Sequence, residues 1–298
     1  MPANFLSDKE ERDMKVGIYC HNSDEGADPL DVARLTEELG FESFFCAEHT
    51  HIPVSRESPY PMPPWELPRE HFRMRDPFVT LSAAAAVTER IRLGTAICLV
   101  VCRDPILLAK TTASLDLLSK GRVILGVGAG WNLEEMANHG TNPKTRTRLM
   151  EERVRAIKEI WTKDEAEFHG EFVNFDPIFA WPKPVQKPYP PVLIGGGGPT
   201  VIDRVIGFGD GWLPGHQKDL NALGERIDEL HTRSEEAGRG RLPVTIMMGH
   251  ARFFGDYARI GAERVVVEAP AGEFSEVRAM MTSLAEAMRK YEAEHEHA

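Results

Sequence analysis

Short apolar runs recur along this chain, and each is followed by a longer segment with helix-forming character. Most of the runs are continuously apolar rather than alternating, which is typical of strands buried on both faces of a parallel sheet. Eight such strand-then-helix units in 298 residues favour a closed (β/α)8 TIM barrel over an open sheet. The runs expected to form strands are residues 16–20, 41–47, 92–99, 123–128, 191–195, 211–213, 244–248 and 264–267.

The predicted helices have recognisable boundaries. An aspartate followed by a proline opens three of them, at positions 28–29, 76–77 and 104–105. The aspartate can accept hydrogen bonds from the free N–H groups of the first turn, and proline fits that turn. Gly40 and Gly121 are expected to end the first and third of these helices. Further helices are expected at residues 133–161 and 201–208, and from residues 219 and 274.

One segment interrupts the alternation. Residues 166–168 and 172–175 are expected to pair as a hairpin, and a proline-rich connector follows them. We therefore expect residues 163–190 to be an insertion between the fourth and fifth strands rather than a linker between domains. Residues 14–298 are predicted to form a single domain, and the polar residues 1–13 a flexible tail.

Composition excludes several classes of partner. The formal net charge is 35 − 46 = −11, which disfavours a nucleic-acid surface because phosphates need a basic face. No apolar run approaches the roughly 18 residues needed to span a membrane. Four cysteines lie in apolar strand-like runs, which predicts reduced thiols and a cytoplasmic protein. They are Cys20, Cys46, Cys98 and Cys102.

A glycine-rich stretch follows the fourth predicted strand. Gly126, Gly128 and Gly130 alternate with small residues and lead into a helix. Glycine lacks a Cβ, so a flat ligand could approach closely here, or the strand end could pack tightly with no ligand. The spacing fails the dinucleotide fingerprint, because the third glycine comes one residue early, so a nicotinamide fold is not supported.

Chemistry in such barrels lies at the carboxyl ends of the strands. The second strand ends in Glu48-His49-Thr50-His51, which could provide an acid–base pair, metal ligands or ordinary loop residues. No lysine or histidine follows the fourth or fifth strand to complete a metal cage, so no metal is expected.

The fifth strand runs into four consecutive glycines, Gly195, Gly196, Gly197 and Gly198, ahead of a predicted helix. Their N–H groups could bind a cofactor phosphate, although a purely structural turn is the alternative. The Lys-Ser/Thr pair of a nucleotide-binding loop is missing. The long loop from Thr50 to Arg75 contains four arginines and three aromatic residues, which suits a lid over a planar, anionic ligand.

Taken together, these segments resemble the luciferase-like flavin and deazaflavin oxidoreductases, in particular the coenzyme F420-dependent branch. The resemblance spans residues 14–215 in register. The segments that carry it are EHTHIP (48–53), DP (76–77), RLGTA (92–96), DPILLAK (104–110), LSKGR (118–122), LGVGAGWN (125–132), WPKPV (181–185), PVLIGGGG (191–198) and GDGW (209–212).

The resemblance implies a cofactor ring at the barrel mouth, with His49 beside it to assist proton transfer and Glu48 as a second catalytic residue. It implies a non-proline cis peptide at Ala96-Ile97 behind the ring. It also places the cofactor phosphate on the four glycines. The full set of implied cofactor-binding residues is Thr95, Ala96, Ile97, Gly128, Ala129, Gly130, Trp131 and Gly195 to Gly198.

Two departures bear on the substrate. Trp131 stands where the sugar-phosphate dehydrogenase branch has a glutamate, and Glu48 stands where an aspartate is common. These departures leave the substrate open. The resemblance implies an F420-dependent oxidoreductase that moves a hydride to or from a small organic substrate, as a homodimer. The alternatives are a reduced-FMN monooxygenase that uses oxygen, a non-catalytic luciferase-like subunit, and a metal-dependent barrel hydrolase.

Overall fold

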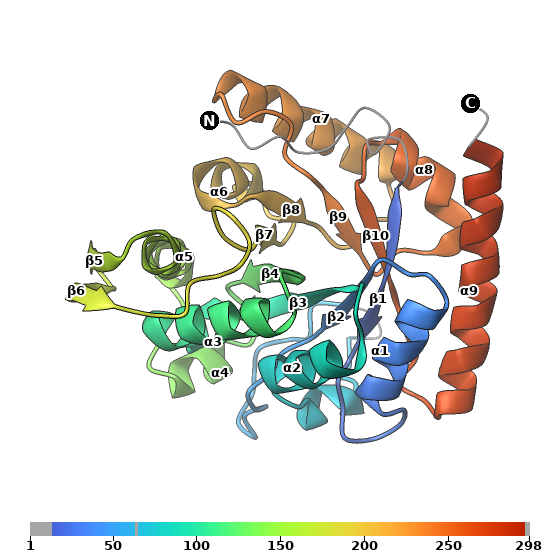
Figure 1. The fold of residues 1–298 in the computed structure, drawn as a ribbon, viewed down its shortest axis with the longest axis horizontal. Coiled ribbons are helices and arrows are strands. Elements are labelled where there is room, and N and C mark those ends of the chain that lie inside the picture. Colours follow the sequence, from blue (N-terminus) through green and yellow to red (C-terminus); the bar gives the residue numbers. More distant parts are fainter. Residues whose placement is uncertain (1–13, 63–64, 296–298) are drawn as a thin grey trace.

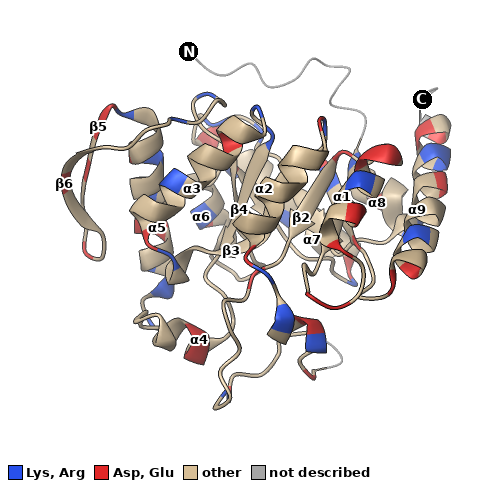
Figure 2. Cartoon of the chain, turned by 60° about the horizontal axis from the view of Figure 1, so that its bottom comes forward, with Lys and Arg blue, Asp and Glu red and all other residues tan. Residues whose placement is uncertain are grey.

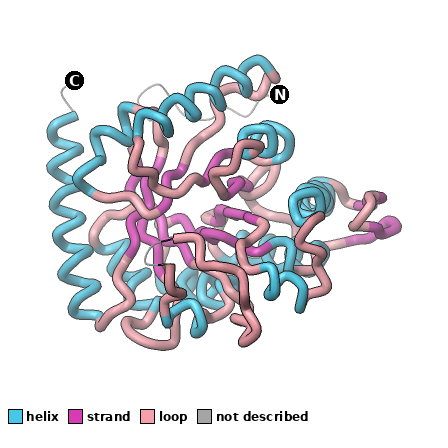
Figure 3. Tube along the Cα trace, turned by 180° about the vertical axis from the view of Figure 1, so that it is seen from behind, coloured by secondary structure: helices cyan, strands magenta, loops and turns pink. Residues whose placement is uncertain are grey.

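A computed structural model describes residues 14–62 and 65–295, so the predicted tail lies outside the described residues. Eight parallel strands form one sheet in the order β8-β7-β4-β3-β2-β1-β10-β9. Two isolated parallel bridges, Trp212 to Val244 and Gly215 to Met247, join the edge strands β8 and β9. Helices surround the strands (Figures 1 and 3), which confirms the predicted TIM barrel.

The barrel strands are β1 (Lys15–Cys20), β2 (Ser43–Cys46), β3 (Arg92–Leu99), β4 (Val123–Gly128), β7 (Val192–Gly195), β8 (Gly211–Leu213), β9 (Thr245–Met247) and β10 (Arg264–Glu268). The α-helices are α1 (Pro29–Glu38), α2 (Pro77–Val87), α3 (Pro105–Leu118), α4 (Leu133–Asn138), α5 (Arg146–Thr162), α6 (Val201–Phe208), α7 (Leu220–Glu236), α8 (Phe254–Arg259) and α9 (Phe274–His295). Three 3-10 turns complete the described part: η1 (Arg69–Arg73), η2 (Val100–Cys102) and η3 (Ala251–Phe253).

The predicted helix boundaries are confirmed at atomic detail. Asp28 accepts a hydrogen bond from the Leu30 N–H (2.8 Å), and Asp76 and Asp104 cap α2 and α3 in the same way. Gly40 and Gly121 have φ values of +86° and +84° after α1 and α3, where a side chain would be strained.

Two predicted ranges are refined by the structure. The helical region expected at residues 133–161 contains two helices, α4 and α5, because Gly140 turns to φ +74° and Pro143 follows. The insertion is a hairpin of β5 (Glu165–His169) and β6 (Asn174–Phe179), so its second strand starts later than predicted. It projects beyond α5 at one side of the barrel (Figure 1). The short helix α8 was not predicted.

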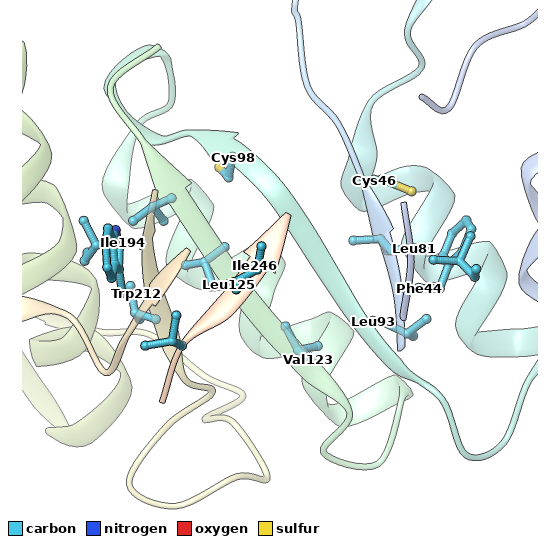
Figure 4. Close-up of a cluster of buried hydrophobic side chains, with 14 of the residues drawn as sticks. Phe44, Cys46, Leu81, Leu93, Cys98, Val123, Leu125, Ile194, Trp212 and Ile246 are labelled. Atoms are coloured by element: carbon cyan, nitrogen blue, oxygen red, sulfur yellow. The ribbon is translucent and has the colours of Figure 1, made fainter. Parts of the chain in front are cut away.

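The core has two parts. Side chains between the strands and the outer helices form the larger one, including Phe44, Cys46 and Cys98 (Figure 4). All four cysteines are free. A smaller cluster inside the barrel takes residues from seven strands or strand ends: Tyr19, Phe45, Ala47, Ile124, Leu193, Leu213, Met247 and Val266. Interior residues therefore fill the barrel and leave only its mouth for a ligand.

Acidic and basic residues alternate along the outer helix α9 (Figure 2). None of the helices in the described ranges has an apolar stretch long enough to cross a bilayer.

Candidate active site

A cavity of about 570 Å³ opens at the carboxyl ends of the barrel strands. Tyr19, Leu213 and Met247, from the top of the interior cluster, form part of its lining. Most of the predicted site residues also line it: Glu48, His49, Ala96, Ile97, Gly128, Ala129, Gly130, Trp131, Gly195, Gly196 and Gly198. The imidazole and three of the four consecutive glycines therefore share one cavity.

Two predicted cofactor residues, Thr95 and Gly197, are not part of this lining. Thr95 is buried, and its hydroxyl donates to the Gly126 carbonyl across the β3–β4 pair (2.8 Å). The Gly197 carbonyl accepts a hydrogen bond from Arg226 Nη1 (2.6 Å). Both residues hold neighbouring parts of the wall in place, and their direct contact with a cofactor stays a prediction.

The floor of the cavity is built around Ile97. The Ala96–Ile97 peptide is cis, as the resemblance implied, and the β3–β4 register shifts between Thr95 and Cys98. A methyl group on Gly128 would lie 2.1 Å from Ile97 Cδ1, and one on Gly195 would lie 2.9 Å from Ile97 Cγ2. These two glycines are therefore required by the packing of Ile97, while their backbones still face the cavity.

One end of the cavity is suited to an anion. Gly196 has φ +112°, which side-chain-bearing residues rarely adopt, and a Cβ on Gly196 or Gly198 would meet almost no other atom. Arg146 at the start of α5 and Arg204 of α6 line the same cavity. Among the described residues, the buried Nε of Arg204 has no hydrogen-bond partner. Burial and the charge of Arg146 both lower the pKa of Arg204. An anion between these two guanidinium groups would offset their mutual repulsion, and the open glycine backbone beside them leaves room for it.

His49 is held by a carboxylate that the sequence analysis missed. His49 Nδ1 lies 2.7 Å from Glu135 Oε2, and Glu135 Oε1 accepts the Thr50 N–H (2.8 Å). Burial by itself would raise the pKa of Glu135, but the hydrogen bonds from His49 and Thr50 lower it. An ionised carboxylate only accepts, so His49 carries its proton on Nδ1 and leaves Nε2 for a substrate.

Both carboxylate oxygens of Glu48 accept hydrogen bonds. The Leu99 N–H donates to Oε2 (2.6 Å), and Arg103 Nε donates to Oε1 (2.7 Å). Arg103 in turn donates to Asp76 Oδ2 (2.6 Å). These contacts tie the end of β2 to the end of β3 and the start of α2. They are those of a positioning residue, and a catalytic role for Glu48 stays a prediction.

Trp131 lies at the centre of an aromatic cluster. Its ring meets the rings of His49 and Tyr60 edge-on, with centroids 5.5 and 5.6 Å apart. The Arg56 guanidinium lies over the indole at 5.6 Å. The indole therefore packs against the edge of His49, where the sugar-phosphate branch would have a carboxylate.

The loop from Thr50 to Arg75 does form a wall of the cavity, since Tyr60, Met62, His71 and Met74 line it. Its arginines do not belong to that lining, contrary to the expectation that they bind the ligand. Arg69 pairs with Glu25 and Arg73 with Asp24, both on the connector after β1. Asp24 and Glu25 are far from these arginines in the sequence. The sequence therefore did not reveal the ion pairs, and the positive charge of the loop was interpreted as a site for an anionic ligand.

The two histidines that follow β2 turn to different partners. His51 hydrogen-bonds to Thr50 Oγ1 (2.9 Å) and Asn138 Nδ2 (2.9 Å), while His49 turns to Glu135. The two imidazoles therefore have separate hydrogen-bond partners.

Comparison with known proteins places these features in context. A family model described as "Luciferase-like monooxygenase" matches residues 14–296. Uncharacterized protein Rv0953c of Mycobacterium tuberculosis is 44% identical over 79% of this chain and 83% of its own length. An F420-dependent glucose-6-phosphate dehydrogenase of Kineococcus radiotolerans is 31% identical over 72% of this chain, and the match covers 61% of that relative.

Relatives with a different cofactor are also found. An FMNH(2)-dependent dimethylsulfone monooxygenase of Pseudomonas putida is 32% identical over 54% of this chain and 45% of its own length. Among solved structures, monooxygenase RslO1 from Streptomyces bottropensis superposes with a TM-score of 0.77 over 93% of this chain and 99% of its own, at 20% identity. That structural likeness supports the fold.

Proposed function

This chain belongs to the luciferase-like monooxygenase family, and from that premise we propose that it is an oxidoreductase that uses coenzyme F420 and a small, hydrophobic organic substrate. The observation that carries the proposal is the arrangement of charged groups around the cavity. A pair of arginines and open glycine backbone lie at one end, and His49 with its carboxylate lies in the same cavity. A planar coenzyme with a phosphate tail matches both features.

The residues present fit such a coenzyme. The unpaired Nε of Arg204, the left-handed Gly196 and the neighbouring Arg146 suit a phosphate group. The floor formed by Ala96 and Ile97 suits the face of a flat ring. Bound there, a deazaflavin supplies hydride transfer at its C5 carbon.

The protein supplies the proton and excludes water. A carbonyl or activated alkene that accepts a hydride becomes an anion. A His49 ring that is protonated on both nitrogens would give its Nε2 proton to that anion and be left neutral, with its remaining proton on Nδ1. In the reverse direction Nε2 would take the proton from an alcohol. Glu135 holds Nδ1–H in both cases, so the ring stays in the tautomer and orientation that the transfer needs.

The lining favours an apolar substrate. Tyr60, Met62, Met74 and Met248 line the same cavity as His49, and among the described residues the arginines in this lining are Arg146 and Arg204. A sugar phosphate would compete with the coenzyme phosphate for those arginines. Trp131 stands in place of the glutamate of the sugar-phosphate branch, which also favours an apolar substrate over a sugar phosphate. We therefore propose a ketone, secondary alcohol or activated alkene with hydrophobic substituents rather than glucose 6-phosphate.

A reduced-FMN monooxygenase is the second candidate, favoured by the Pseudomonas putida relative. Parallel fluorescence titrations of the purified protein with F420 and FMN distinguish the two. We expect tighter binding of F420, and tighter binding of FMN together with oxygen consumption would reverse the cofactor assignment. Binding without turnover for any reductant would indicate a non-catalytic subunit.

The role of His49 is tested separately. His49→Ala should bind coenzyme normally and lose at least about 100-fold in turnover, the usual size of an acid–base contribution. His51→Ala is the matched control, since this neighbouring imidazole is not among the residues that line the cavity. Unchanged turnover in His49→Ala would refute the proton-transfer role.

A further inference from the structure

A second group of side chains, distinct from the His49–Glu135 pair, adjoins the cavity, and one of its members, His71, also lines it. His21 follows β1, Glu70 and His71 belong to η1, and Glu268 ends β10. One ligand atom each from His21, Glu70 and His71 can be chosen so that all three lie within 4.8 Å of one another. Two remote segments of the chain thus bring two imidazoles and a carboxylate together, and Glu268 contacts His21 from a third.

The polar atoms of this group are poorly satisfied. The Nδ1 atoms of both His21 and His71 are buried and have no hydrogen-bond partner within the described ranges. Both histidines are buried, with exposed fractions of 7% and 6%. Unpaired nitrogen atoms at this depth are costly unless something else binds them.

The charges in the group do not balance. His21 Nε2 contacts Glu268 Oε1 and lies 4.0 Å from Glu70 Oε1, so one imidazole faces two carboxylates. The nearby cations Arg69 and Arg73 pair with Glu25 and Asp24 instead. No lysine or arginine in the part of the chain that the structure describes forms an ion pair with Glu70 or Glu268. A divalent cation would supply the missing positive charge.

We propose that His21, Glu70 and His71 form a binding site for one divalent transition-metal ion, of which zinc is the best match, with Glu268 as a fourth ligand. Two imidazoles and a carboxylate are a common zinc donor set, whereas magnesium prefers oxygen ligands alone. Zinc ligands in a tetrahedral site are roughly 3.3 Å apart, as bonds of 2.0–2.1 Å require. Shifts of less than about 1 Å per ligand would close the present group to that size.

The surroundings suit His71 as a metal ligand. Tyr60 Oη lies 3.4 Å from His71 Nε2, so the hydroxyl can orient the ring from its far side. The ion would fix η1 against the end of β1, next to the cavity wall.

This site is tested independently of the proposed function. Purified full-length protein, freed of metal by dialysis against a chelator and carrying no affinity tag, is titrated with zinc against a chromophoric competitor. We expect one ion per chain. His21→Ala and Glu70→Gln should each weaken zinc binding by about tenfold or more, while binding of F420 or FMN is retained. His169→Ala, on the exposed β5–β6 hairpin, should leave zinc affinity unchanged.

Cobalt binding gives a second readout, because its visible absorption reports the ligand geometry. A spectrum typical of four-coordinate cobalt in the wild type, lost in Glu70→Gln, would support the site. Glu70 lies on the surface turn η1 with a partly exposed side chain, so this variant should fold even if His21→Ala does not. Equal zinc affinity in the wild type and Glu70→Gln, or no stoichiometric zinc in the wild type, would overturn the proposal. The cluster would then be an ordinary His21–Glu268 ion pair.

Discussion

Replacement of Arg204 by methionine should weaken the binding of phosphate-bearing coenzyme and leave the binding of its phosphate-free form intact. Arg204 Nη2 lies 4.0 Å from the position that a Cβ on Gly196 would occupy, and its Nε is buried without a partner. A hydrogen bond to a charged group contributes about 1.5–3 kcal/mol. At about 1.4 kcal/mol per tenfold change, loss of this contact should weaken binding roughly 10- to 150-fold.

The assay is a double comparison of two proteins and two ligands. Riboflavin shares the ring and ribityl chain of FMN but lacks its phosphate. The difference between the affinities for FMN and riboflavin therefore measures the contribution of the phosphate to binding. Arg204→Met should bind FMN, or F420, 10- to 150-fold more weakly, whereas its affinity for riboflavin should stay within about twofold of the wild type. That limit matches the usual scatter of roughly 0.3–0.5 kcal/mol for independent effects.

Arg233→Met is the matched control. This arginine pairs with Asp203 and Glu229 on the surface of α7, so its loss removes the same charge away from the cavity. An equal loss of FMN and riboflavin affinity in Arg204→Met would indicate general damage to the fold. No loss of FMN affinity would show that the phosphate lies elsewhere, and the reasoning from the glycine run would fail.

Three further predictions follow from other contacts. Glu135→Gln should lower turnover by roughly 10- to 150-fold while coenzyme affinity is unchanged, because it removes a charged hydrogen bond that holds His49. Burial opposes ionisation of Glu42, but the charge and hydrogen bonds of Arg264 lower its pKa to about 2 from a usual 4.5. The pair should therefore contribute about 3 kcal/mol of stability above pH 4.5 that is lost as pH falls toward 2, measurable by denaturant unfolding of wild type and Glu42→Gln. Leu107→Glu should convert the expected homodimer to a monomer in light scattering, since Leu107 is 65% exposed on α3 beside the uncharged helix α2 (Figure 2).

For each of these three predictions, one experimental result would contradict it. Wild-type turnover in Glu135→Gln would mean that the carboxylate does not orient His49. If wild type and Glu42→Gln lost stability equally between pH 5 and pH 3, the low pKa would not be the source of acid sensitivity. A monomeric wild type would contradict the homodimer itself. Leu133→Glu, an exposed leucine on α4, is the control for a charge added at the surface.

Local signals made the barrel predictable. Continuous apolar runs and the Asp-Pro caps act within a few residues of each other, so the sequence shows them directly. The helix break at Gly140 was missed because the helical pattern resumes beyond it, and α8 was missed because it is only six residues long. The cis peptide at Ala96-Ile97 was expected from family resemblance, not from the local sequence.

The site was less predictable because its contacts are remote in sequence. Glu135 reaches His49 across 86 positions, and no spacing rule connects them. Glu135 follows Asn132 by three residues, which suggests a capping role, and Asn132 does accept the Glu135 N–H (3.1 Å). Its side chain nevertheless reaches His49, which lines the cavity. In the sequence, Glu135 therefore looked like an ordinary residue of a helix N-terminus, although its carboxylate holds His49.

Strand ends and helices contribute different features to the cavity. This difference explains why the barrel was easier to predict than the site, and it predicts the orientation of a bound coenzyme. Strand ends supply shape, through Ile97 and the glycines that pack around it. The helices that follow β4 and β7 supply charge: Glu135 from α4, Arg146 from α5 and Arg204 from α6. The negative group is bound to His49 and the positive groups flank Gly196. We therefore expect a coenzyme with an anionic tail to bind with its phosphate beside Gly196, because the reversed pose would set the phosphate near Glu48 and leave the buried Nε of Arg204 without a partner among the described residues.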